Sequence, residues 1–334
     1  MDRKLYILSA KQISVQTPLT EDWMQSPLKP EGPLAKAVDP DFRQFVSAGD
    51  ARRMGRLLKR AVATSVSAMK EGGIEHPDAI ITGTGFGSIE NTELFLNAMV
   101  FEGEQMLKPT QFMQSTHNTT SSLIGIHTGS HGYNSTYSQK SLSFDSALFD
   151  AWLQFRLGKI DNALVGSHDE MSPLFSGFML KAGYAREPEV LSETAVSIML
   201  GQEPASGAYC TLEGLTILDR PDAGLLATAI SEMTGGVMPD AIMTGRSGNA
   251  EHDAAYGFLD KMLCGVPQLS YKPLFGVSFS SSAIGFYAAA CCLRDGIIPS
   301  CLNADGKPIL KPGSILVVNV AEGRHVSVSL LKAI

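Results

Sequence analysis

An internal repeat constrains the fold of this chain more than any other feature of its sequence. The segment PDAIITGTGFGS (77–88) is echoed by PDAIMTGRSGNA (239–250), and TSSLIG (120–125) is echoed by SSSAIG (280–285). The two echoes occur in the same order and at nearly the same spacing. Together they predict two copies of one supersecondary unit, with the chain divided near its midpoint.

Each copy has the pattern of a helix followed by a short buried strand. Apolar residues at helical spacing in 55–73 lead into the apolar run DAIITG, and those in 225–236 lead into DAIMTG. Strands that alternate with helices predict an α/β fold with a mostly parallel sheet in each copy.

We expect the two sheets to pack around shared central helices. The run AIGFYAAACCL (283–293) is apolar on all sides and is a candidate for such a buried helix. The polar stretch EPASGAY (203–209) is the expected junction. The predicted halves are therefore 1–205 and 206–334.

The composition disfavours several classes of function. The formal net charge of −7 and the pI near 5.5 argue against nucleic acid as a partner, because phosphate binding needs a basic face. No apolar run approaches the roughly 20 residues that span a bilayer. The start MDRKLYILSAKQ has too short an apolar run for a secretory signal, so we expect a cytoplasmic protein. The five cysteines form no CxxC pair or metal framework, so we expect reduced thiols, no metal and no cofactor.

One local segment, ARRMGRLLKRA (51–61), is strongly basic. It is either the solvated face of a helix or a dock for an acidic macromolecule. The basic residues concerned are Arg52, Arg53, Arg56, Lys59 and Arg60.

Several longer segments follow one another in the order of a known family. They are 80–93 (IITGTGFGSIENTE), 109–125, 143–170, 191–203 and 276–303 (GVSFSSSAIGFYAAACCLRDGIIPSCLN). The last is the most specific, because of its Arg-Asp-Gly-x-x-Pro ending. In these segments the chain resembles the β-ketoacyl synthases of fatty-acid and polyketide assembly. The resemblance implies a thiolase-like α/β fold, with two similar halves in a five-layered αβαβα arrangement, assembled as a dimer.

The resemblance also places the family's catalytic positions on other side chains. The acyl-carrying cysteine corresponds to Ser141 and the two histidines to Thr244 and Val277, whereas Lys272 is retained. A serine hydroxyl needs an adjacent base to attack a thioester. Neither threonine nor valine can titrate as histidine does. We therefore expect a site in which the condensation chemistry has been abandoned.

Relatives of this kind that lack the cysteine serve as chain-length factors, which pair with an active synthase and help shape its tunnel. The resemblance thus implies a synthase subunit as heterodimer partner, or a second copy of this chain, with acyl carrier protein as a further partner. The pathway would be of the aryl-polyene or a related polyketide type. The strand 132–139 would pair across the dimer, and the basic segment would dock the carrier protein. Residues expected at the tunnel or dimer interface are Met113, His117, Asn118 and Tyr137.

Two other interpretations stay open. The chain could be an acyltransferase, or a synthase variant, that uses Ser141 as nucleophile with a base brought in by folding. It could instead be a homodimeric acyl-binding scaffold.

Further motifs carry weaker signals. GTGFGS (83–88) lacks the third glycine and the acidic residue of a dinucleotide site, so we interpret it as a tight turn. His127 and His131 have a metal-like spacing but no third ligand. The cluster 168–170 coincides with the family's Gly-Gly-x-Glu and is expected to be structural, and His252 and Asp253 are expected on the surface.

Overall fold

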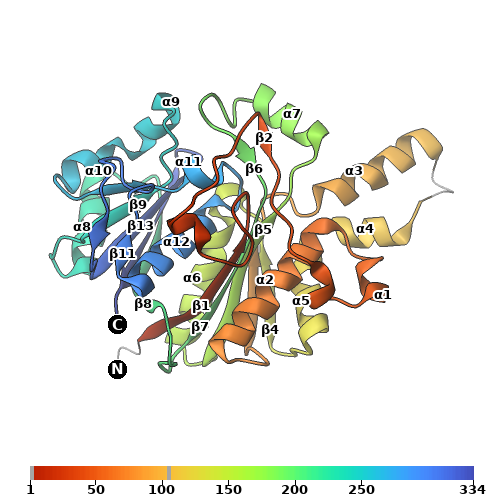
Figure 1. Cartoon of the computed structure of the whole chain (residues 1–334), viewed down its shortest axis with the longest axis horizontal. Helices are drawn as coiled ribbons and strands as arrows, with labels where there is room; N and C mark the ends of the chain where they lie inside the picture. Colours follow the sequence, from red (N-terminus) through yellow and green to blue (C-terminus); the bar gives the residue numbers. More distant parts are fainter. Residues whose placement is uncertain (1–3, 104–106) are drawn as a thin grey trace.

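The computed structural model describes residues 4–103 and 107–334. Within these ranges the long strands form one continuous sheet, of ten strands in the order β10-β9-β13-β14-β8-β1-β7-β5-β3-β4 (Figure 1). The strands are β1 (Leu5–Ile13), β3 (Ala79–Gly83), β4 (Tyr133–Tyr137), β5 (Asn162–Asp169), β7 (Thr194–Gly201), β8 (Cys210–Asp219), β9 (Ala241–Thr244), β10 (Gln268–Ser270), β13 (Ser314–Ala321) and β14 (His325–Lys332).

The same pairing pattern runs outward from the centre of the sheet in both directions. β1 pairs with β8 in antiparallel fashion. Beyond them, β7 and β14 are antiparallel to both neighbours, while β5–β3–β4 and β13–β9–β10 are parallel. The expectation of a mostly parallel sheet is therefore wrong. Strands such as β13 and β14 follow one another through a tight turn, and such a connection allows only antiparallel pairing.

The two sequence echoes have different outcomes. The first falls on β3 and β9, which occupy equivalent places in the two five-strand runs. The second falls on α5 (Thr119–Thr128), which precedes the edge strand β4, and on α12 (Ser281–Asp295), which follows the edge strand β10. The helix that follows β4 is α6 (Ser143–Arg156), so the second echo does not mark equivalent helices.

Helices cover both faces of the sheet. α6 and α12 contact each other and share one apolar core on one face of both strand runs. α2 (Arg56–Gly72) and α5 pack on the other face of the first run, and α8 (Ala223–Thr234) and α10 (Gly257–Met262) on the other face of the second. Every residue of α12 from Ser281 to Leu293 is buried, which confirms the prediction of a central helix there.

The remaining elements are short connections. Most of them are helical turns or two-residue strands. They are α1 (Ala48–Ala51), α3 (Ile89–Asn97), α4 (Pro109–Ser115), α7 (Pro173–Lys181), α9 (Ala250–Asp253), α11 (Lys272–Phe275), β2 (Leu34–Ala35), β6 (Leu191–Ser192), β11 (Ile297–Ile298), β12 (Ile309–Leu310), 3₁₀ turns at Asp22–Met24, Phe42–Gln44, Lys140–Leu142 and Ala254–Tyr256, and a π-helical turn at Ala98–Glu102.

One part of the chain projects from the rest. Figure 1 shows α3 reaching away from the sheet, with α4 beneath it. The projection carries large apolar side chains that face solvent, among them Val100, Phe112 and Phe101, which is 81% exposed.

Among the described helices, none is long and apolar enough to cross a membrane.

Candidate functional site

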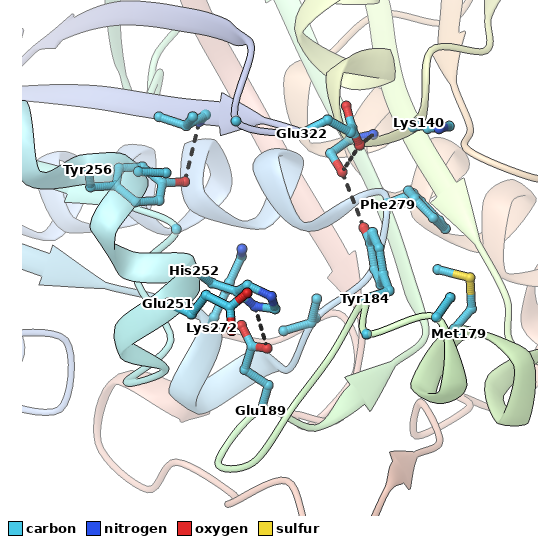
Figure 2. Close-up of a pocket in the computed structure, with 18 of the residues that line it drawn as sticks. Lys140, Met179, Tyr184, Glu189, Glu251, His252, Tyr256, Lys272, Phe279 and Glu322 are labelled. Atoms are coloured by element: carbon cyan, nitrogen blue, oxygen red, sulfur yellow. Dashed lines mark hydrogen bonds and ion pairs between the residues drawn. The ribbon is translucent and has the colours of Figure 1, made fainter.

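A cavity of about 570 Å³ lies between the two strand runs, where several connecting segments meet (Figure 2). The turn between β4 and α6 supplies Ser141, and the turn between β13 and β14 supplies Glu322. Lys272 and Val277 line another wall. The structure thus brings Ser141, Lys272 and Val277 into one cavity, whereas Thr244 is not among its lining residues and only the adjoining Gly245 is.

Ser141 sits in a tight turn at the start of α6. The preceding residue, Lys140, has a left-handed backbone with φ of 52°. The Ser141 hydroxyl donates a hydrogen bond of 2.8 Å to Glu322 Oε1, and its oxygen lies 3.2 Å from the Tyr184 hydroxyl. The sequence did not predict an acidic partner for this serine.

The Glu322 side chain reaches Ser141 from a two-residue turn. Glu322 and Gly323 both have left-handed backbones, with φ of 50° and 62°, and Arg324 N donates to Ala321 O over 3.0 Å. This is the geometry of a type I′ hairpin turn, in which glycine is favoured at the second position.

The polar groups of Thr244 and Val277 are engaged within the chain. The Thr244 hydroxyl is buried and donates to Leu269 O over 3.0 Å. The Val277 backbone N–H donates to Val190 O over 2.8 Å, and the valine side chain is buried against the cavity.

A histidine does line the cavity, although it was expected on the surface. His252 Nδ1 lies 2.7 Å from Glu189 Oε2, and Glu189 also accepts a hydrogen bond of 2.7 Å from the Ser247 hydroxyl. Burial alone would raise the pKa of Glu189, but the hydrogen bonds from Ser247 and His252 lower it overall. Glu189 is therefore held in its charged form by these two hydrogen-bond partners. The partners are distant in sequence, so no spacing signal announces them.

Lys272, unlike Glu189 and His252, has no partner of opposite charge at contact distance among the described residues. Its side chain is half-buried at the start of α11, and desolvation by burial lowers its pKa despite the more distant charges of Glu189, Asp253 and Glu322. Nearby, Tyr256 is buried, and burial raises its pKa to about 12.

The family can be assigned from the sequence match. A model of the N-terminal domain of beta-ketoacyl synthases matches residues 21–213, more than half of the 334-residue chain. The chain belongs to the β-ketoacyl synthase family. The matched range includes Ser141 and ends before Thr244, Lys272 and Val277.

Solved structures show the fold of this family member. A beta-ketoacyl synthase from Burkholderia phymatum STM815 is 14% identical, with a TM-score of 0.84 over 99% of this chain and 100% of that one. A ketosynthase in complex with its chain length factor from Xenorhabdus doucetiae is 16% identical, with a TM-score of 0.77 over 99% and 98%. A chain from the structure of a type II PKS acyl-carrier protein in complex with its ketosynthase is 15% identical. Its TM-score is 0.82, over 99% of this chain and 100% of that one.

These likenesses show an α/β thiolase-like fold. No curated protein matches the sequence.

The interface residues named from the synthase resemblance lie outside the cavity. Met113, His117 and Asn118 are exposed at the end of α4 and the start of α5. Tyr137 is half-buried at the end of β4. β4 is an outer strand that pairs with β3 and ends the sheet. These residues therefore share one side of the molecule with an unpaired strand edge.

The basic segment 51–61 needs two corrections. It is not one helix, because α1 ends at Ala51 and α2 begins at Arg56, and Arg52 and Arg53 lie between them. Arg60 cannot belong to a docking surface, because it is 1% exposed and forms a buried ion pair of 2.9 Å with Glu193.

The other basic residues of this segment remain accessible. Arg52, Arg53 and Arg56 are exposed, and Lys59 is half-buried. One face of the segment is therefore free to meet an acidic partner.

The glycine-rich turn 83–88 is filled by the chain itself. Asp169 accepts hydrogen bonds from the backbone N–H groups of Gly85 and Phe86 and from the Thr84 hydroxyl. These donors are therefore already paired with a carboxylate, which agrees with a structural turn.

The cluster 168–170 is buried, as expected for a structural element. Burial lowers the pKa of His168 to about 3 and raises that of Glu170 to about 7. In the part of the chain that the structure describes, His127 and His131 join no group of three potential metal ligands.

Proposed function

We propose that this chain is a non-catalytic β-ketoacyl synthase homologue of fatty-acid or polyketide biosynthesis, which acts as a chain-length-factor-like partner of an active synthase. The observation that carries the proposal is the set of side chains at Ser141, Thr244 and Val277. Claisen condensation needs a thiolate-like nucleophile and groups that handle the departing carboxylate and the enolate. A serine, a hydrogen-bonded threonine and a buried valine meet neither need. Aryl-polyene pathways are one polyketide type that such a subunit would serve.

The open side of the sheet supports a partner subunit. Among the described strands, β3 is the one neighbour of β4, and an open outer edge is a liability unless another chain covers it. The projection formed by α3 and α4 exposes Phe101, Phe112 and Met113, and α4 contacts α5, which packs beside β4. A synthase subunit that pairs with β4 would cover the strand edge and the apolar projection. Two of the similar structures are described as complexes of ketosynthases with partners. A second copy of this chain is the alternative occupant.

Acyl carrier protein is the second proposed partner. The exposed residues Arg52, Arg53 and Arg56, with Lys59, form a basic patch on a chain whose net charge is −7. Carrier binding at a basic patch follows from electrostatic complementarity, which acts mainly on specificity and association rate.

We also propose that residues 1–205 and 206–334 are two similar halves in a five-layered arrangement. The repeated pairing pattern and the position of α6 and α12 between outer helices support this division. The loop between β7 and β8 contains the boundary.

One observation favours a second candidate function. The bond of 2.8 Å from Ser141 Oγ to Glu322 supplies the adjacent base that a serine nucleophile needs. An acyltransferase that forms an ester on Ser141 is therefore the competing proposal.

Co-purification tests the first proposal. The chain is co-expressed with a synthase encoded beside its gene, and the complex is isolated by a tag on the synthase. We expect a heterodimer that Phe101→Glu disrupts, while Leu310→Glu leaves it intact, because Leu310 is 69% exposed on β12, away from the projection. A stable homodimer that never co-purifies with a synthase would overturn the proposal and favour the scaffold interpretation.

A further inference from the structure

The amine of Lys272 is unusual among the charged groups of the cavity. Among the described residues, no carboxylate forms an ion pair with Nζ, and no acceptor takes a hydrogen bond from it. Glu189, a nearby acid, is occupied by Ser247 and His252. A lysine that lines a cavity without a close acidic partner has nothing at contact distance to favour its charged form.

The space around this amine is created by Gly245. A Cβ atom on Gly245 would lie 2.4 Å from the Tyr256 hydroxyl and 3.2 Å from Lys272 Cε, so the two side chains converge on the glycine. Figure 2 shows Lys272 and Tyr256 on the same side of the cavity, whereas the His252 ring is directed toward Glu189. Any larger residue at 245 would close this space.

Tyr256 is placed to supply a proton there. Its oxygen accepts a hydrogen bond of 3.3 Å from Val320 N, and no described residue accepts its own proton. Burial raises the pKa of the phenol to about 12, so its proton stays on the oxygen at neutral pH. Because this O–H has no acceptor among the described residues, it can donate a hydrogen bond to an oxygen bound beside Lys272 and pass its proton to that oxygen as it leaves.

Part of the cavity lining is apolar. Val277, Phe279 and Met179 belong to it, beside polar and charged residues such as Glu189 and His252. Burial lowers the pKa of Lys272, so a larger fraction of the amine is neutral and nucleophilic than for a lysine in water. Desolvated lysines of this kind form imines with carbonyl compounds.

We propose that Lys272 is a nucleophilic amine that binds a 1,3-dicarbonyl compound covalently and reversibly. The choice of a 1,3-dicarbonyl rests on the proposed polyketide function, because a growing polyketide chain carries ketones at alternate carbons. The accessible amine itself does not depend on that function.

Enaminone formation on Lys272 needs no reactant other than the diketone. The Nζ lone pair forms a bond to the ketone carbon, the carbonyl oxygen takes a proton, and a carbinolamine results. Tyr256 protonates the hydroxyl, which leaves as water, and the tyrosine is reprotonated by a proton lost from nitrogen. The resulting imine shifts a proton from the carbon between the two carbonyl groups and becomes an enaminone. Water reverses the sequence and releases the diketone.

The test uses the isolated chain with acetylacetone and its longer homologue hexanoylacetone. We expect the ultraviolet band of an enaminone and a mass gain equal to the diketone less one water, mapped by peptide analysis to Lys272. Lys272→Arg and Lys272→Met should abolish the adduct, the arginine variant serving where methionine impairs folding. The matched control is Lys140→Met, which removes an exposed lysine from the mouth of the same cavity and should leave the adduct unchanged.

Two further readouts sharpen the test. Tyr256→Phe should slow adduct formation by about 100-fold, the lower end of general-acid effects. The rate in the unsubstituted chain should level off at a pH below the ordinary range for lysine. The proposal is overturned if no enaminone forms, if the adduct maps to Lys140 or other lysines, or if the Lys272 variants form it equally. None of these results bears on co-purification with a synthase, so the two proposals can fail independently.

Discussion

The Ser141 hydroxyl donates a hydrogen bond of 2.8 Å to Glu322, a residue that lies 181 positions further along the chain. The same carboxylate oxygen lies 3.3 Å from Ser141 N, so one acid accepts from both the side chain and the backbone of this turn. A helix N-terminus favours a negative charge, and Glu322 supplies one at the start of α6. Ser141, which the sequence predicts at the position of the family cysteine, thus takes part in a contact between the two strand runs.

The first prediction concerns acylation of Ser141. If the chain is non-catalytic, incubation with acyl-CoA or acylated carrier protein leaves no ester on Ser141. The partner synthase should then make the same product with Ser141→Ala or Glu322→Gln. Intact-protein mass spectrometry and product analysis check both points. An acyl adduct that Ser141→Ala abolishes and Glu322→Gln slows would establish the acyltransferase alternative.

The second prediction concerns carrier-protein docking. Charge reversal at Arg53 and Arg56 should weaken carrier binding about tenfold at low salt, because exposed charge contacts contribute up to about 1 kcal/mol each. The effect should shrink at higher salt as screening increases. Titration calorimetry at two salt concentrations measures it. Lys159→Glu reverses an exposed charge beyond the end of α6 and is the control. Unchanged affinity in the double variant would mean that the patch is only a solvated surface.

The sequence anticipates the local parts of this fold better than its long-range contacts. The echo on β3 and β9 and the buried helix α12 are visible because each depends on residues close together in the chain. The second echo wrongly predicted a pair of equivalent helices, because small polar residues recur at the starts of unrelated helices.

The missed features of the site all depend on distant segments. Ser141 pairs with Glu322, and His252 pairs with Glu189, across long separations in the sequence. The basic neighbours of Arg60 in sequence predict a surface position, whereas its acidic partners Asp39 and Glu193 come from distant segments. No spacing rule links residues that only the closed fold brings together.

The third prediction follows from the burial of Arg60. Arg60→Met should lower the free energy of unfolding by about 3–5 kcal/mol, because it leaves the buried carboxylate of Glu193 without its main cation. Arg56→Met, one turn earlier on α2, should cost less than about 1 kcal/mol, since Arg56 is exposed and its ion pair with Asp39 is longer, at 3.5 Å. Urea denaturation of both variants compares them directly. Equal stabilities would contradict the assignment of Arg60 to the core.

The fourth prediction concerns pH and Asp145, in the first turn of α6 behind Ser141. Asp145 is buried, and burial raises its pKa to about 6, although it accepts hydrogen bonds from the Ser327 hydroxyl and from Asn319 Nδ2 at 2.8 Å. An unfolded aspartate titrates near pH 3.9. Between about pH 4 and pH 6 the folded state therefore binds more protons than the unfolded state. The free energy of unfolding should fall as pH rises through this interval, by roughly 2–3 kcal/mol for this group, and stay lower above it.

Asp145→Asn removes the titrating group, so its stability should fall less across that interval than the stability of the unsubstituted chain. The slope is the informative quantity, because replacing the carboxyl group by an amide also changes the hydrogen bonds to Ser327 and Asn319 and so shifts stability at every pH. Urea unfolding at several pH values between about 4 and 8 gives the two slopes. Asp305→Asn, at an exposed aspartate, is the control for the loss of one surface charge. Identical slopes in the Asp145 variant and the unsubstituted chain would show that this carboxyl group does not take up a proton on folding.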